Sequence, residues 1–244
     1  MAEAKLEEKS MPLLDHLIEL RTRLINSVIA VLVLFFISYY FSLEIYDFLV
    51  APLADVLEEM GGERRLIFTA LHEAFFTYIK VAFFAAIFLA FPFIAAQMWM
   101  FIAPGLYKNE KRAFLPFLVA APLLFLVGAA MVYYVMLPFV MLFSLGQQVT
   151  GGGISAELLP KVSDYLNLVM ALLLAFGLCF QLPVVMTLLG MAGIVSSSAL
   201  AKGRKYAIVA IAVVAAFVTP PDPISQIMLG IPLVLLYEVS IWCV

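Results

Sequence analysis

Long apolar runs separated by short polar segments dominate the chain, and apolar residues follow one another instead of alternating with polar ones. Uninterrupted runs of about 18 or more residues are typical of membrane-spanning helices, whereas a membrane β-barrel requires alternation. The runs predict six spans, at 24–43, 75–101, 114–142, 165–190, 205–218 and 224–243. Because bilayer hydrocarbon offers no partner to an unpaired backbone group, we predict an all-α integral membrane protein. Residues 1–244 are expected to form a single membrane domain.

Two of the connections between spans are long enough to carry structure of their own. The 44–74 segment places apolar residues at helical spacing with acids on the remaining face. This pattern predicts an amphipathic helix on the membrane surface, interrupted near Pro52 and ended by the glycines that follow it. The Gly-rich 143–164 connection falls on the same side of the membrane, so we expect the two connections to form a cap on the outer face.

The fifth span is shorter than a bilayer is thick. Residues 205–218 make 14 residues, which is about 21 Å of helix against a hydrocarbon layer of roughly 30 Å. Lipid must therefore be thinner at this place, or neighbouring protein must cover the difference.

Composition supports the membrane assignment and excludes several functions. Hydrophobic residues make up 65% of the chain, charged residues make up 13%, and the mean hydropathy is +1.10. A soluble domain has about 45–50% apolar residues. The few basic residues lie in short clusters, so binding to a nucleic-acid backbone is not expected. The two cysteines lie in apolar runs and predict neither a disulfide nor a zinc site, and we expect no metal or cofactor.

The basic residues predict the orientation in the membrane. Ten of the 14 lysines and arginines fall in the segments before residue 24, at 102–113 and at 191–205, all on one side of the predicted topology. Basic loops face the cytoplasm. Both chain termini, including the 1–23 segment, are therefore predicted to be cytoplasmic in a multi-pass protein of the cell inner membrane.

Polar side chains within the spans are candidates for function, because a polar group in hydrocarbon is costly unless it is paired. Gln181 lies near the middle of the fourth span, and Glu238 lies within the sixth. Gln226 begins the sixth span beside a proline-rich turn, close to Thr219 and Asp222. These side chains either form hydrogen bonds between helices or present a polar face to a partner, and for Gln226 a third possibility is capping its own helix.

Enzyme motifs are lacking. His72 and Glu73 begin a pattern found in zinc proteases, but Phe76 stands where the second histidine is required. The chain shows no Gly-rich phosphate loop followed by lysine, so it is not expected to hydrolyse ATP. We predict a protein that is not an enzyme.

An acid at the entrance to the first span needs an explanation. In "HLIELRTRL", residues 16–24, Glu19 stands close to Arg21 and Arg23, where the orientation rule explains the arginines alone. One interpretation is a local ion pair between Glu19 and Arg23, four residues apart on a helix. The other is a receptor for a cation, and the pattern alone does not choose between them.

The chain resembles the TatC family, the multispanning receptor subunit of the twin-arginine protein translocase. The resemblance rests on "HLIELRTRL", "FIAPGLYKNEKR", "FGLCFQLPVV" and "TPPDPISQ", in that order, and covers residues 11 to 244. It implies a cup-like bundle of six helices with short fifth and sixth helices and a cap on the outer face.

The resemblance also implies a binding site for signal peptides that carry paired arginines. The acids that receive the arginines would be Glu19 and Glu110, with Arg21 and Phe101 shaping the site, while Pro52 matches a position in the cap. A carboxylate suits the rigid fork of a guanidinium. The alternative for Glu110 is a local pair with a neighbouring lysine.

The implied partners are TatB-like and TatA-like single-span subunits, signal peptides of folded cargo and membrane lipid, with a homo-oligomer in the assembled receptor complex. The implied function is export of folded proteins driven by the proton motive force. Gln181 departs from the family, which usually has glutamate there, so a proton-relay role at this position is not expected. A small-solute secondary transporter is the competing function, although no internal repeat supports it.

Overall fold

The computed structural model describes residues 11–59, 66–106, 111–146, 161–191, 193–219 and 223–244. Nearly all of these residues are helical, which confirms the predicted all-α class. The elements are α2 (Met11–Tyr40), α3 (Ser42–Glu59), α4 (Glu73–Leu106), α5 (Lys111–Met131), the π-helix η1 (Val132–Met136), α6 (Leu137–Leu145), α7 (Val162–Cys179), α8 (Leu182–Met191), α9 (Ser197–Val218) and α10 (Pro223–Cys243).

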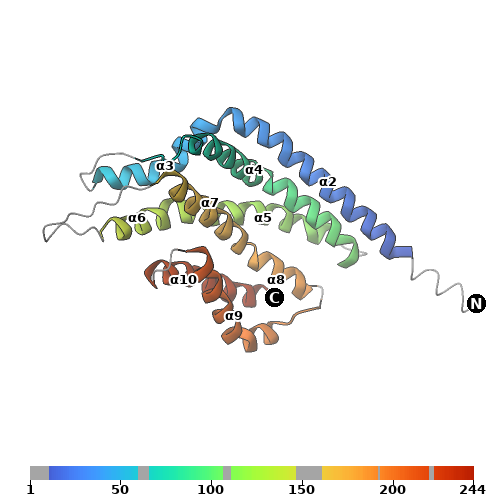
Figure 1. Ribbon diagram of the computed structural model, residues 1–244. Coiled ribbons are helices and arrows are strands. Elements are labelled where there is room, and N and C mark those ends of the chain that lie inside the picture. The colour runs from blue at the N-terminus through green and yellow to red at the C-terminus, as the bar shows by residue number, and fades with distance from the viewer. Residues whose placement is uncertain (1–10, 60–65, 107–110, 147–160, 192, 220–222) are drawn as a thin grey trace, which may run out of the picture.

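The helices run back and forth between two ends of the bundle. At the first end α2 and α5 begin and α4 and α8 end (Figure 1). We call it the basic end because most lysines and arginines of the described residues belong to the helix segments at this end. At the opposite end α3 lies, α6 ends and α7 begins, and we call it the cap end. Helices α9 and α10 lie beside α7 and α8, away from α2, which is consistent with the predicted cup (Figure 1).

Most predicted spans correspond to long apolar helical segments. Within the described residues, the stretches long and apolar enough to cross a membrane are Asp15–Tyr40, Glu73–Phe101, Pro116–Ser144, Val162–Met191 and Ser225–Cys243. The predicted 205–218 span lies inside α9, which has 22 residues and begins earlier, at Ser197. The backbone N–H of Ala199 donates to the hydroxyl of Ser196, and this N-cap extends the helix through a charged first half.

The sixth predicted span is short, because Ser225–Cys243 has 19 residues against 26 to 30 in the other long apolar stretches of the described residues. Because the first half of α9 carries Lys202, Arg204 and Lys205, only its second half is apolar enough for hydrocarbon.

Helix α7 lies at the centre of the bundle and packs closely on α5. A Cβ added to Gly177 would lie 2.5 Å from the ring of Phe125, and one added to Gly128 would lie 2.9 Å from the carbonyl oxygen of Phe176. The missing side chains allow the two helices to approach, as small residues do between membrane helices. The Phe125 ring stacks on Phe91 of α4, with centroids 3.8 Å apart, so the same contact fixes α4.

Helix α3 continues through Pro52, so the predicted interruption near this residue is wrong. Proline has no N–H to donate to the carbonyl four residues earlier, which here belongs to Phe48. The hydroxyl of Tyr133, in η1, donates to that carbonyl at 2.7 Å, and its ring stacks on the Phe48 ring with centroids 4.5 Å apart. Tyr165 of α7 donates to the next carbonyl, that of Leu49, at 2.9 Å. The Tyr133 hydroxyl therefore supplies the donor that Pro52 lacks, and Tyr165 adds a second hydrogen bond to the same turn of α3.

This arrangement predicts that Tyr133→Phe destabilises the protein by about 0.5–1.5 kcal/mol, because the Phe48 carbonyl loses its donor while the ring stacking remains. Tyr134→Phe is the matched control, since the Tyr134 side chain is 71% exposed. Thermal unfolding in detergent measures both. Equal stability of the two variants would contradict the role given to the Tyr133 hydroxyl.

The segment before α4 is joined to the start of α7. The N–H of Val162 donates to the carbonyl of Ile67 at 3.1 Å. One carboxylate oxygen of Glu73 accepts from the backbone N–H groups of Thr69 and Ala70, at 2.6 and 3.2 Å, and the other lies 3.8 Å from the ammonium nitrogen of Lys161. The described parts of the two predicted cap segments thus meet at one end; residues 60–65 and 147–160 lie outside the description.

Candidate functional site

The first candidate site lies along the line of contact between α2 and α4 near the basic end, where the two helices run side by side (Figure 1). The ring of His16 stacks on that of Phe101, with centroids 4.1 Å apart and planes 14° apart. Seven residues further along α2, Arg23 reaches α4. Residues 16, 19 and 23 share one face of α2, and this spacing places Glu19 between the two contacts.

Arg23 connects Glu19 to α4. Its Nη2 lies 3.2 Å from Oε1 of Glu19, and its Nη1 donates to Oε1 of Gln97 at 3.2 Å and lies 3.6 Å from the sulfur of Met100. The Glu19 side chain is 33% exposed. The carboxylate is therefore held in place and is still accessible from the basic end, with a second oxygen and further lone pairs as acceptors.

The structure brings only some of the predicted peptide-binding residues together. Glu19 and Phe101 lie at the same contact between α2 and α4. Arg21 is exposed and is two residues from Glu19, so it extends toward another face of α2. Glu110 lies outside the described residues. The local ion pair of Glu19 with Arg23 is present, and a pair of this spacing on a helix contributes only a few tenths of a kcal/mol.

Gln181 lies at a break in the fourth span, two residues before Pro183. Helix α7 ends at Cys179 and α8 begins at Leu182. The side-chain amide of Gln181 donates to the carbonyl of Ala121 in α5 at 2.9 Å and to that of Gly177 at 3.5 Å. Gln181 therefore joins the break to α5, which agrees with the interhelical hydrogen bond considered from the sequence.

A second candidate site is a groove between α9 and α10, with a volume of about 400 Å³. Apolar side chains and Gln226 line it; the lining residues are Ile208, Ile211, Ala212, Gln226, Ile227, Gly230, Ile231, Val234 and Leu235. Gln226 donates to the carbonyl of Ala212 at 3.1 Å, so its amide bridges the two helices instead of capping its own. A Cβ added to Gly230 would meet nothing within 4 Å.

The other predicted residues near this groove behave differently. Thr219 is 7% exposed, and its hydroxyl donates to the carbonyl of Ala215 at the end of α9, so it caps the helix. Asp222 lies outside the described residues. Glu238 accepts two hydrogen bonds from Arg204, at 2.7 and 2.9 Å, which joins α10 to α9 nearer the basic end.

Some residues at these sites were missed from the sequence. Gln97 is 6% exposed and accepts a hydrogen bond from Arg23. The sequence contained a signal for it, because a polar residue in a long apolar run, here between Ala96 and Met98, is usually paired. The pairing of Arg204 with Glu238 joins residues 34 positions apart, and nothing local to either residue predicts it.

These features define a multi-pass α-helical membrane protein with an acid-containing surface at the basic end and an apolar groove along its last two helices. The model of the family described as "Sec-independent protein translocase protein (TatC)" matches residues 15–232. The chain belongs to the TatC family.

Individual relatives agree with the family match. The chain is 50% identical to the Sec-independent protein translocase protein TatC of Magnetococcus marinus over 235 residues, which are 96% of this chain and 84% of the relative. It is 40% identical to that of Escherichia coli K12, with 96% and 88% covered. A crystal structure described as the twin-arginine translocase receptor TatC in DDM superposes with a TM-score of 0.82 at 39% identity, covering 93% of this chain and 98% of the other.

The family and the structure confirm the predicted class, the fold and a protein translocase component that is not an enzyme. They do not favour the small-solute transporter. A multi-pass membrane protein is likewise confirmed.

Proposed function

We propose that the chain is the signal-peptide receptor and core scaffold of a twin-arginine translocase, which exports folded proteins using the proton motive force. The observation that carries the proposal is Glu19, an accessible carboxylate fixed at the contact of α2 and α4 on the basic end. We place the basic end and both termini in the cytoplasm, at the inner membrane, because basic segments face that side.

The geometry at Glu19 suits a guanidinium. Gln97 and Met100 hold one arm of Arg23, and its other arm orients the carboxylate. Because the carboxylate is already fixed, less side-chain entropy is lost when a peptide binds. An incoming arginine is a planar fork that bonds both oxygens of a carboxylate, while a lysine ammonium is a point charge and loses this bidentate contact.

The remaining predicted residues complete this site. Glu110, which follows α4 in the sequence, would take the second arginine of the pair. Phe101 would offer an apolar surface beside the charged groups, since its ring already stacks on His16. Arg21 would help to shape the site from its own, exposed face of α2. Pro52 belongs to the cap, where α3 is tied to η1.

The groove between α9 and α10 would receive the single helix of a TatB-like or TatA-like subunit. Gly230 and Ala212 leave room for close approach, and the Gln226 amide is a polar group that a partner helix can bond. Several copies of this chain would assemble with these partners in the receptor complex, with membrane lipid around them.

Photo-crosslinking tests the receptor assignment directly. A photoreactive residue at position 19, 101 or 110 is expected to crosslink to a synthetic twin-arginine signal peptide in native membranes, because each position is assigned to the peptide site. Position 44, an exposed acid at the cap end, is the matched control. Crosslinks from position 44 as strong as those from 19, or none from any of the three, would contradict the proposal.

A further inference from the structure

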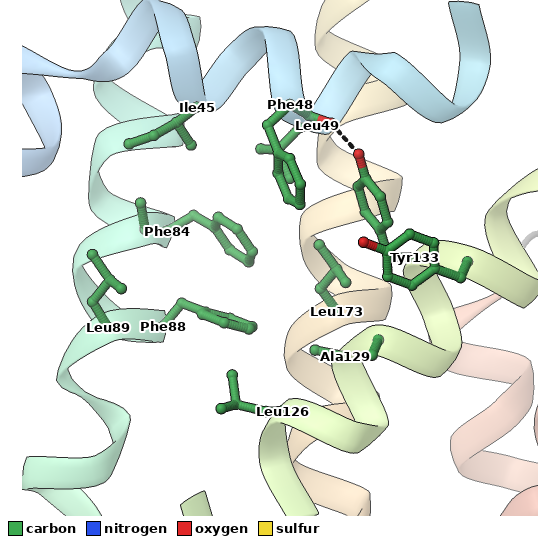
Figure 2. A pocket seen from close by; sticks show the side chains of 13 residues that line it. Ile45, Phe48, Leu49, Phe84, Phe88, Leu89, Leu126, Ala129, Tyr133 and Leu173 are labelled. Carbon is green, nitrogen blue, oxygen red and sulfur yellow. Dashed lines mark hydrogen bonds between the residues drawn. The ribbon is translucent and has the colours of Figure 1, made fainter. Parts of the chain in front are cut away.

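An apolar cavity of about 330 Å³ lies under the cap (Figure 2). Helix α3 crosses above it with Ile45, Phe48 and Leu49, and the other walls come from α4, α5, η1 and α7. The rings of Phe84 and Phe88 point from α4 toward the wall formed by α5 and α7, as Figure 2 shows. The cavity is separate from the peptide site and from the groove between α9 and α10.

The cavity lies at membrane depth and opens to the surface of the bundle. Its α4 residues, 84–89, fall near the middle of the Glu73–Phe101 span, and its residues 126–134 fall near the middle of Pro116–Ser144. Three lining residues at the rim, Leu89, Leu126 and Tyr134, are 57%, 51% and 71% exposed. At this depth the surrounding medium is hydrocarbon, so the opening faces lipid tails.

The chemistry of the walls excludes a polar occupant. All of the 13 lining residues are apolar or aromatic. The Tyr133 hydroxyl is already bonded to the Phe48 carbonyl. A buried water needs two to four polar partners, and these walls do not provide them. An empty space would deprive the lining atoms of dispersion contacts, so an apolar occupant stabilises the site.

The surroundings of the cavity identify its apolar occupant. An acyl chain has no hydrogen-bonding groups to satisfy, and walls made of apolar and aromatic side chains offer it dispersion contacts along its length. The hydrocarbon layer into which the cavity opens supplies such chains at high concentration.

A local irregularity of the backbone forms one wall. The N–H of Leu137 donates to the carbonyl of Val132, five residues earlier, and Pro138 follows without an N–H of its own. The extra residue of this π-turn places Tyr133 under α3 and Tyr134 at the opening. Such π-turns are often found at functional sites.

We propose that this cavity binds one acyl chain of a phospholipid from the leaflet at the cap end. The bound chain fills the space between α3, α4 and η1 and thereby connects the cap to the bundle. This site is independent of signal-peptide binding, and its test can fail while the receptor function stands.

Photolabelling in vesicles tests the proposal. The full chain is reconstituted with a phosphatidylglycerol that carries a diazirine midway along one acyl chain, irradiated, digested and mapped. We expect several-fold more label on residues 84–89 and 126–134 than on residues 28–36 of α2, a helix whose apolar residues are also widely exposed. This ratio is measured on the unaltered protein and depends on no variant.

Two substitutions on α5 refine the test. Ala130→Phe places a ring in the opening and is expected to reduce labelling of residues 84–89 several-fold. Val127→Phe is the control, because Val127 is 54% exposed on the same helix and does not line the cavity. Labelling of the cavity segments no stronger than that of α2, or unchanged labelling in a folded Ala130→Phe protein, would overturn the proposal. Loss of the label when a signal peptide is added would also overturn it, in favour of the peptide as occupant.

Discussion

Replacing Glu19 by alanine is expected to weaken binding of a twin-arginine signal peptide by roughly 1–3 kcal/mol, or about 5- to 150-fold in Kd. The physical reason is the loss of a charge-assisted, bidentate acceptor at a fixed position between α2 and α4. Glu110→Ala is expected to have an effect of the same order, and a peptide with both arginines changed to lysine should bind as weakly to the unaltered protein. Titration of labelled peptide into the purified protein measures all three.

A purely structural role of Glu19, in its ion pair with Arg23, predicts a different result from the receptor role. If Glu19 served only that pair, Glu19→Ala would cost a few tenths of a kcal/mol of stability and leave peptide affinity unchanged. Glu44→Ala removes an equal charge at the cap end and is the control for general electrostatics. Peptide affinity that is the same in the Glu19, Glu110 and Glu44 variants, with all three folded, would contradict the receptor assignment.

The fold was largely predictable because hydrophobic continuity determines it. Uninterrupted apolar runs located the long membrane helices, since few structures satisfy backbone groups in hydrocarbon. The start of α9 was not predicted, because Ser196 caps a helix whose first half is charged and the apolar pattern registers only the second half. Continuity of α3 through Pro52 was also not predicted, since it depends on the hydrogen bond from the Tyr133 hydroxyl to the Phe48 carbonyl, and these two residues are 85 positions apart in the chain.

The candidate sites were predictable in identity and less so in geometry. Glu19 and Gln226 stood out because each is a polar residue in an unexpected place. What each contacts depends on helix packing. Gln97 of α4 accepts a hydrogen bond from Arg23 of α2, which holds Glu19, and the Gln226 amide of α10 donates to the Ala212 carbonyl of α9. Sequence spacing gives contacts within one helix, whereas contacts between helices require the packed bundle.

The groove between α9 and α10 gives the second large expected effect. Cysteines at positions 212, 227 and 230 are expected to crosslink to the helix of a TatB-like or TatA-like partner, because these residues line the groove. Cysteines at 215 and 229 belong to the same helices but replace Ala215 and Leu229, which are 0% and 1% exposed, so they should not. Cysteines at 124–128 of the third span should crosslink much less. The native Cys179 and Cys243 are first replaced.

Filling the groove is expected to abolish both the crosslink and export. Gly230→Phe adds a ring where an added Cβ meets no neighbour within 4 Å, so the bundle itself has room for it while a partner helix does not. Steric overpacking costs about 1–3 kcal/mol, which is about 5- to 150-fold in partner affinity. Val127→Phe places the same ring on a lipid-facing position of α5 and should leave export intact. Because peptide binding depends on the contact between α2 and α4, Gly230→Phe should keep normal signal-peptide affinity, and a loss of affinity would show that the two sites are not separate. Export that persists in Gly230→Phe, with the partner still crosslinked from position 227, would place the partner elsewhere on the bundle.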